Sequence, residues 1–131
     1  QRSVDAEKEN THLSVSASQF SDTGLKSVMD YVAPKNTNVL FYPGYFPDTI
    51  RKGFADLKFA FVHLDADLYE PTSAGLRFFY PRMSVGGIIL AHDYNAWPGA
   101  RAAIDEFFSN KDEIPIPMPD KSGSALIVRQ A

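Results

Sequence analysis

The chain has 131 residues, of which 44% are hydrophobic and 13% are aromatic. This is enough for one domain that buries roughly two-thirds of the surface of its unfolded chain. The formal net charge of -3 provides no general attraction for phosphate backbones, so we expect no nucleic-acid partner. The absence of cysteine excludes disulfides and thiolate metal sites within the chain.

The sequence also shows no signal for a membrane or for secretion. No apolar run approaches the ~20 residues that span a bilayer, and the N-terminal QRSVDAEKEN lacks the apolar core of a signal peptide. We therefore expect a cytoplasmic chain with no membrane partner. Residues 1–12 are polar and aperiodic, which predicts a separate N-terminal segment, and residues 13–131 are expected to form a single domain.

The first predicted element is a helix that Ser21 or Asp22 can cap and that Pro34 ends. Its apolar positions recur at helical spacing, at Leu25, Val28, Met29 and Val32. Residues 38–42 then read as a short strand closed by a Pro-Gly pair, and residues 48–54 as a short helix.

Two strands are predicted in the second half, at residues 58–64 and 85–91. The run at 58–64 is β-branched and aromatic without alternation, which is typical of a strand covered on both faces in a parallel sheet. Helices are predicted at residues 71–79, where Pro71 suits the first turn, and at residues 100–108.

The last predicted elements are strands at residues 114–118 and 124–129, which flank a turn-forming segment and predict an antiparallel hairpin. Before this hairpin, strands alternate with helices. That order predicts an α/β fold with a mostly parallel sheet, right-handed crossovers and an antiparallel edge.

Polar side chains follow both buried strands. In an open α/β sheet, ligands bind beyond the carboxyl ends of the strands, so these side chains are the candidates for a functional site. They are Asp65, Asp67, Tyr69 and Glu70 after the first strand, and His92, Asp93 and Tyr94 after the second.

Asp65 and Asp93 are expected to end neighbouring strands about 5 Å apart. Carboxylates that converge in this way repel one another unless a cation or a proton lies between them. Oxygen ligands with one imidazole suit Mg²⁺, Mn²⁺ or Ca²⁺, so we predict a divalent cation held by Asp65 and Asp93 with His92 as third ligand. The alternative is that these acids only favour the starts of the following helices.

Other polar residues near the strand ends are open to two interpretations. Asp67 alternates with Asp65 and is expected to point elsewhere, either in a structural role or in support of the ligand residues without being a ligand itself. His63 either touches a ligand or is a satisfied histidine at the strand end. Trp97 either packs its loop or contacts substrate, and Arg101 pairs with a site carboxylate or with solvent.

Several motifs in this order resemble one known family. The stretch HLDADLYEPTSAGLRFFYPRMSVGGIILAHDYNAWPGARAAIDEFF is similar to the C-terminal half of the macrocin O-methyltransferase (TylF) family, whose pattern is D-x-D-L-Y-x-x-T, Y-P-x-L-x-x-G-G, D-D-Y and G-A-R-x-A-x-D-x-F. The upstream FYPGYFPDT resembles that family's strand followed by G-x-F-x-x-T. The resemblance runs from about Phe20 to the end of the chain.

The resemblance implies an S-adenosylmethionine-dependent O-methyltransferase with a Rossmann-like sheet, in which Mg²⁺ orients a hydroxyl of a sugar or related small molecule. It implies that Asp65 is the first metal-binding acid and that His92 and Asp93 fall on two adjacent acids. It also makes His63, with Asp65, a candidate for contact with the cofactor. The candidates for contact with the substrate are Tyr94, Trp97 and Arg101.

The chain departs from the family pattern in two respects. His92 stands where the family has Asp, so a nitrogen that protonates near pH 6.5 replaces an oxygen ligand. No glycine-rich turn follows a strand, and Gly86-Gly87 precedes one. We therefore expect the N-terminal cofactor-binding strands to be missing. A sheet without them exposes an edge, which predicts a homo-oligomer or pairing with a missing N-terminal segment.

Two alternative functions follow from the same residues. The first is a degenerate methyltransferase-like domain that binds a partner or a sugar without catalysis, which the missing glycine turn and His92 favour. The second is a metal-dependent glycosyltransferase, because D-x-D after a strand can hold Mg²⁺ and a diphosphate. The glycosyltransferase leaves the Gly86-Gly87 pair and the DYNAWPGAR segment unexplained.

Overall fold

A computed structural model of the chain describes residues 24–32 and 38–131. Its elements, in chain order, are α2 (Leu25–Val32), the 3-10 helix η2 (Lys52–Phe54), β1 (Phe59–Leu64), α3 (Tyr69–Phe79), the 3-10 helix η3 (Tyr80–Arg82), β2 (Met83–Ala91), α4 (Pro98–Phe108), β3 (Ile116–Pro117) and β4 (Ala125–Val128). The expected segment at 1–12 and the expected caps Ser21 and Asp22 lie outside the described residues.

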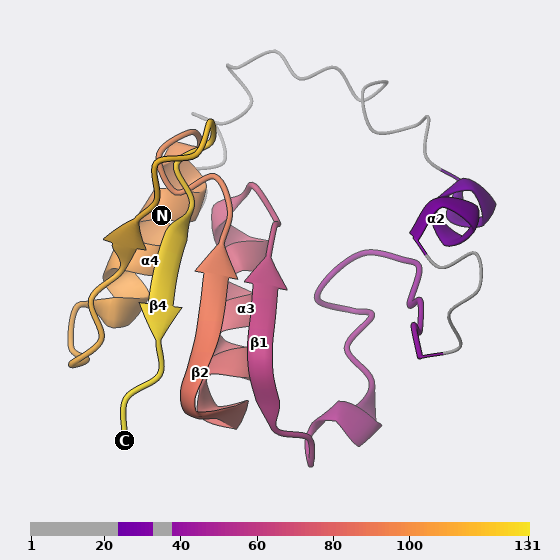
Figure 1. The fold of residues 1–131 in the computed structure, drawn as a ribbon, viewed down its shortest axis with the longest axis horizontal. Helices are drawn as coiled ribbons and strands as arrows, with labels where there is room; N and C mark the ends of the chain where they lie inside the picture. The colour runs from indigo at the N-terminus through magenta and orange to yellow at the C-terminus, as the bar shows by residue number, and fades with distance from the viewer. Residues whose placement is uncertain (1–23, 33–37) are drawn as a thin grey trace.

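The four described strands form one sheet in the order β1-β2-β4-β3 (Figure 1). β1 and β2 run parallel, with α3 in the connection between them. β4 runs antiparallel to both β2 and β3. The prediction of an α/β fold with a parallel portion and a C-terminal antiparallel hairpin is therefore confirmed, although both hairpin strands are shorter than expected.

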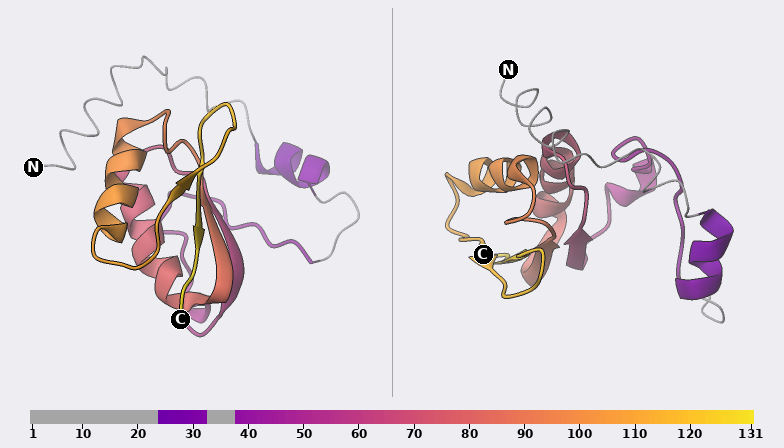
Figure 2. Two further views of the ribbon diagram at one scale, coloured as in Figure 1. Left: turned by 60° about the vertical axis from the view of Figure 1, so that its left-hand side comes forward. Right: turned by 90° about the horizontal axis from the view of Figure 1, so that it is seen from above.

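Helices α3 and α4 lie together against one face of this sheet (Figure 2). Alternation along β1 turns Val62 and Leu64 toward the helices, where both are buried. Leu76 of α3 and Ile104 of α4 have no exposed surface. The hydrophobic core therefore lies between this helical layer and one side of the sheet.

The opposite face of the sheet is not covered by any described helix (Figure 1). The side chain of Phe61 in β1 is 58% exposed there, and His63 is exposed as well. The expectation that β1 is covered on both faces is wrong for the described part of the chain. The apolar run was read correctly as a strand, but its pattern could not tell which segment would cover the second face.

The region before β1 differs most from the prediction. Residues 38–42 form no strand in the described structure, and Leu40 is 75% exposed. A strand needs a hydrogen-bonded neighbour, and the sheet supplies none to this segment. The helix expected at residues 48–54 is reduced to η2, because Arg51 directly before it has an extended backbone.

The starts of α3, α4 and β2 each lie two residues before the predicted positions. α3 begins at Tyr69, so Pro71 is its third residue, still within the first turn where proline is tolerated. α4 begins at Pro98 and β2 at Met83. Among the described helices, none has the length and hydropathy needed to cross a membrane.

The C-terminal strand is anchored by a buried carboxylate. Glu113, which is 4% exposed, accepts hydrogen bonds from the Tyr80 hydroxyl at 2.8 Å, from Arg129 Nη1 at 2.7 Å and from the Gln130 backbone N–H at 3.0 Å. Burial by itself raises the pKa of Glu113, but these hydrogen bonds outweigh it and lower the pKa to about 2. Glu113 thus links η3 to the residues that follow β4.

We predict that Glu113→Gln lowers the free energy of unfolding by about 2 kcal/mol at pH 7, because hydrogen bonds to a buried charge are lost. The pKa of Glu113 is lower in the folded state than its ordinary value of 4.5. Its contribution is therefore complete above pH 4.5 and is lost as the pH falls toward 2. Urea unfolding at several pH values should show the two proteins converging in that interval. The control Asp112→Asn, at an exposed neighbour, should change stability by less than about 0.5 kcal/mol.

Candidate active site

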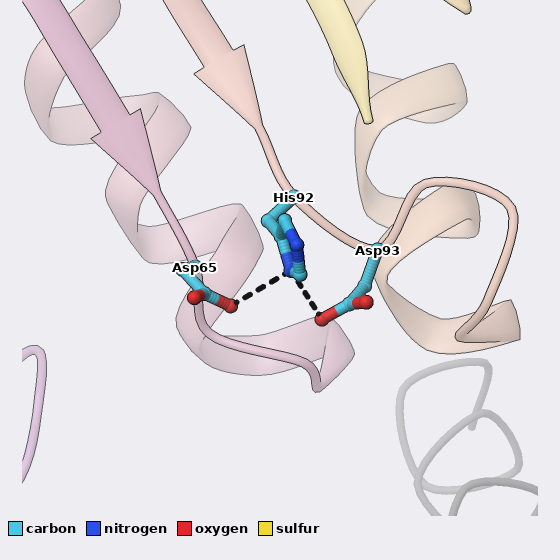
Figure 3. A group of neighbouring side chains, drawn as sticks. All are labelled: Asp65, His92 and Asp93. Carbon is cyan, nitrogen blue, oxygen red and sulfur yellow. Dashed lines mark ion pairs between the residues drawn. The ribbon is translucent and has the colours of Figure 1, made fainter. Parts of the chain in front are cut away.

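Two strand ends meet at the carboxyl edge of the sheet. β1 and β2 are parallel and in register up to their last residues, where Leu64 pairs with Ala91. The His92 backbone N–H donates to the Leu64 carbonyl at 2.9 Å. This hydrogen bond holds the residues that follow β1 and β2 side by side. As a result, the side chains of Asp65, His92 and Asp93 point toward one another (Figure 3).

The distances within this cluster are short. His92 Nδ1 lies 2.8 Å from Asp93 Oδ2 and 3.3 Å from Asp65 Oδ1. One ligand atom from each of the three residues lies within 4.8 Å of the others. Asp93 is buried, whereas the Asp65 side chain is 52% exposed. The cluster is therefore closed on the β2 side and open to solvent on the β1 side.

The arrangement at His92 Nδ1 fits a bound cation. This atom is buried and makes no well-directed hydrogen bond, although two carboxylate oxygens are close to it. Two ligands at right angles around a cation, each about 2.1 Å from it, are about 3.0 Å apart. The two distances from Nδ1 are near that value, so the residues present can hold a hard divalent cation, with the remaining positions open to water or a ligand.

The charges around His92 favour its protonated form when no cation is bound. Burial lowers the pKa of His92, but the close contact with Asp93 and the negative charges of Asp93, Asp65 and Asp120 outweigh it and raise the pKa. A metal ion must therefore displace a proton from this imidazole. The proton and the cation compete for the same two carboxylates.

Asp67 lies beside this cluster and is hydrogen-bonded to Asp93, so it is turned toward the site but supports a ligand candidate without being one of the three grouped residues. β1 ends at Leu64, so the alternation of a strand no longer applies at Asp67, whose backbone has a φ of 56°. Burial raises the pKa of Asp67, and a hydrogen bond to Asp93 and the charges of Asp93 and Asp65 raise it further, to about 6. The sequence did contain a sign of this arrangement: aspartate just past a strand end readily adopts a left-handed backbone, which redirects its side chain.

His63 and Asp65 both line a cavity of about 460 Å³ beside the cluster. The other lining residues are mainly apolar and include Phe46, Pro71 and Phe79. The ring of His63 also lies edge-on to the ring of His92, with 5.9 Å between the centroids. The two residues that we predicted for cofactor contact thus line the same cavity. Their role in binding stays a prediction.

The three residues predicted for substrate contact lie in the loop after Asp93 and in the first turn of α4. Tyr94 is buried, and its hydroxyl donates to Asp105 Oδ1 at 2.6 Å. The Arg101 guanidinium lies 5.0 Å from the Tyr94 ring centroid and 3.5 Å from Asp105, so it pairs with a helix carboxylate. Trp97 is half-buried at the start of α4. Their contact with a substrate stays a prediction.

The tip of the β3–β4 hairpin borders the site, which the sequence reading did not anticipate. The Asn95 backbone N–H donates to the Gly123 carbonyl at 3.2 Å, so the hairpin contacts the loop that carries Asp93. Asp120 Oδ1 accepts a 2.7 Å hydrogen bond from the Ser124 backbone N–H. Its charge acts on His92, and it is therefore a further acid at the rim.

One family model matches nearly the whole chain, and the similar proteins are O-methyltransferases. The family model described as Macrocin-O-methyltransferase (TylF) matches residues 2–129. The chain is 39% identical over 74 residues to the demethyldecarbamoylnovobiocin O-methyltransferase of Streptomyces niveus, covering 56% of this chain and 28% of that protein. It is 39% identical over 69 residues to the 8-demethyl-8-(2,3-dimethoxy-alpha-L-rhamnosyl)-tetracenomycin-C 4'-O-methyltransferase of Streptomyces olivaceus, covering 53% and 26%.

A solved structure shows the same architecture. The O-methyltransferase NovP superimposes with a TM-score of 0.66 and 29% identity, covering 81% of this chain and 43% of the NovP chain. The matched part thus spans less than a third of each of the two relatives above and less than half of NovP.

We predict that Gly123→Ala lowers the free energy of unfolding by about 1–2 kcal/mol, because Gly123 has a φ of 60° that other residues adopt at that cost. An added Cβ would also lie 2.7 Å from the Asn95 Cβ. Urea denaturation measures the loss. Gly86→Ala is the matched control, since Gly86 also has a positive φ, of 78°, and nothing lies within 4 Å of its added Cβ. Equal stability of both variants would contradict the close packing of the hairpin on the site loop.

Proposed function

The chain belongs to the macrocin O-methyltransferase (TylF) family, and we propose that it forms the metal- and acceptor-binding part of an S-adenosylmethionine-dependent enzyme that methylates a hydroxyl of a sugar. The observation that carries the proposal is the convergence of Asp65, His92 and Asp93 at the carboxyl edge of the sheet. The family membership supports the methyl donor. The name of the Streptomyces olivaceus relative, which specifies a rhamnosyl compound, supports a sugar as the acceptor.

The three residues would bind Mg²⁺ or a similar cation through two carboxylate oxygens and one imidazole nitrogen. Such a cation lowers the pKa of a coordinated hydroxyl and fixes its oxygen for in-line attack on a methyl group. Asp65 is half-exposed, so its side of the cluster is open to the acceptor. Asp67 is the carboxylate next to the cluster, and its pKa of about 6 leaves it mainly ionised above neutral pH. In that form it could accept the hydroxyl proton, which it then donates in a hydrogen bond to Asp93.

The methyl donor has to approach from the same open side. The cavity beside Asp65 has room for part of a ligand, about 460 Å³, and His63 and Asp65 are its polar lining. Among the described residues, no strand is followed by a glycine-rich turn of the kind that holds such a cofactor. We therefore assign to this chain only contacts near the reacting methyl group.

A non-catalytic sugar-binding domain is the second candidate function. It is favoured by His92, whose nitrogen replaces a hard oxygen ligand and whose raised pKa sets a proton in competition with the metal. Both candidates require the cation and the sugar, and they differ only in whether a methyl group is transferred. We propose a cytoplasmic location for either, since the small-molecule chemistry needs no membrane.

We predict that isothermal titration calorimetry detects Mn²⁺ or Mg²⁺ binding to the chain at pH 8, and that Asp65→Asn weakens it by tenfold or more because one of two charged ligands is lost. Asp56→Asn is the matched control. Asp56 precedes β1 and is thus about 20 Å away along the six-residue strand. Equal heats for the unmodified chain and Asp65→Asn would remove the metal site.

A second prediction concerns the acceptor. Methyl α-L-rhamnopyranoside should give saturation-transfer NMR signals with the chain in Mg²⁺ and lose them in EDTA or in Asp65→Asn, because its hydroxyls reach the protein through the cation. No signal under any of these conditions would contradict a sugar acceptor.

The same samples, supplied with methyl-labelled S-adenosylmethionine, test whether this chain also transfers the methyl group. Label on the sugar establishes the enzyme. Metal-dependent sugar binding without label on the sugar, and without retention of labelled S-adenosylmethionine in equilibrium dialysis, assigns this chain a binding role.

A further inference from the structure

The short loop that joins β2 to α4 determines where the Asp93 carboxylate points. Asp93 has a left-handed backbone, with a φ of 58°, which even for aspartate is a minority conformation that neighbouring contacts have to select. Its carbonyl accepts hydrogen bonds from the N–H groups of Ala96 at 3.1 Å and Trp97 at 3.0 Å. These two bonds lie within the loop, so other contacts must fix the loop against the rest of the protein.

Two side chains of α4 provide such contacts. Asp105 Oδ1 accepts a 2.6 Å hydrogen bond from the hydroxyl of Tyr94, which is only 7% exposed. Arg101 lies 3.5 Å from Asp105 Oδ2 through its Nε and donates from Nη1 to Asn95 Oδ1 at 3.3 Å. The Arg101 guanidinium is also 5.0 Å from the Tyr94 ring centroid. Both residues that follow Asp93 are thus bound by side chains of α4.

Helix α4 is a firm support for this loop. Its residues Ala100, Ala103 and Ile104 are at most 1% exposed, so the helix cannot shift without disturbing the hydrophobic core. Arg101 and Asp105 are four positions apart and therefore lie next to each other along the helix. Their backbone positions are fixed by the packing of α4, and their side chains extend from there to the loop.

The stability of α4 itself does not account for this pair. Arg101 is the fourth residue of α4, near the positive end of the helix dipole, where a cation is unfavourable. An ion pair four positions apart stabilises a helix best when the acid comes first, and here the base comes first. Both side chains are about half-exposed, at 55% and 49%, and such pairs contribute little to stability. The contacts with Tyr94 and Asn95 explain the pair better.

We propose that Tyr94, Arg101 and Asp105 are positioning residues, which hold the loop after β2 so that the Asp93 carboxylate stays turned toward the other two residues of the cluster (Figure 3). This inference rests on the proposed function, because it takes Asp93 as a metal ligand. It differs from the substrate contact that the sequence suggested for Tyr94 and Arg101. Tyr94 is buried and its hydroxyl already donates to Asp105, so a sugar could bind that hydroxyl only by disturbing the bond that holds the loop.

Tyr94→Phe tests this role, because it removes the hydroxyl without changing the charge and keeps an aromatic ring in the core. We expect it to weaken Mn²⁺ binding, measured by calorimetry at pH 8, by about tenfold, the lower end of the effect of losing a group that orients a metal ligand. Asp105→Ala should cause a similar loss. The double variant should bind about as well as either single variant, because both substitutions remove the same hydrogen bond.

Tyr80→Phe is the matched control. The Tyr80 hydroxyl also donates to a carboxylate, that of Glu113, at 2.8 Å. Tyr80 precedes the nine-residue strand β2, whereas the cluster lies at the other end of that strand. We expect this variant to be less stable than the unmodified chain but to bind Mn²⁺ with the same affinity. A general loss of stability is thereby separated from a loss of positioning.

A second measurement needs no metal. Tyr94→Phe should speed hydrogen exchange of the Ala96 and Trp97 amides by about tenfold relative to the Ile89 amide in the centre of the sheet, because the loop opens locally more often. The comparison with Ile89 corrects for any change in overall stability. Tyr80→Phe should leave this ratio unchanged, and NMR of the metal-free chain measures it.

Unchanged Mn²⁺ affinity in Tyr94→Phe, or an unchanged exchange ratio, would overturn the proposal. Loss of the sugar NMR signals in Tyr94→Phe with intact Mn²⁺ affinity would also overturn it and would assign Tyr94 to substrate contact. An unmodified chain that binds no Mn²⁺ would contradict the proposed function instead, and the metal-free exchange ratio would then decide the positioning role by itself.

Discussion

The parallel register of β1 and β2 is the constraint on which the candidate site depends. Because Leu64 pairs with Ala91, β1 and β2 end side by side. The hydrogen bond from the His92 N–H to the Leu64 carbonyl keeps the residues after the two strands together. Acids that are 28 positions apart in the sequence, Asp65 and Asp93, thus lie around one imidazole. A slip of one residue in this register would turn the buried side chains of one strand to the other face and would separate the cluster.

The strands and helices that contact one another were predictable, because their apolar positions repeat with the period of the element that they form. This held for β1, α3, β2, α4 and the terminal hairpin. It failed at residues 38–42, where the composition favours a strand but no neighbouring strand is present in the sheet. The prediction that both faces of β1 are covered also failed. An apolar run indicates a strand that can be buried on both faces, but it does not indicate which segment covers each face.

The metal-ligand candidates were predictable for a related reason. Strand ends of a parallel sheet meet at one edge, so Asp65, His92 and Asp93 could be grouped without coordinates. Asp67 could not, because its direction depends on a left-handed backbone beyond the strand. The approach of the hairpin through Gly123 and Asn95 could not be predicted either, since no local pattern in the sequence reports a contact between two loops.

The left-handed backbone of Asp67 and Asp93, with φ of 56° and 58°, restricts how this site can evolve. Asparagine, aspartate and glycine adopt that conformation at little cost, so replacement of either acid by most other residues would incur backbone strain as well as loss of charge. His92 carries no such restriction. Changes in the ligand atoms or in the proton balance of the candidate site are therefore most accessible at position 92, whereas loss of charge at 67 or 93 is most accessible through asparagine.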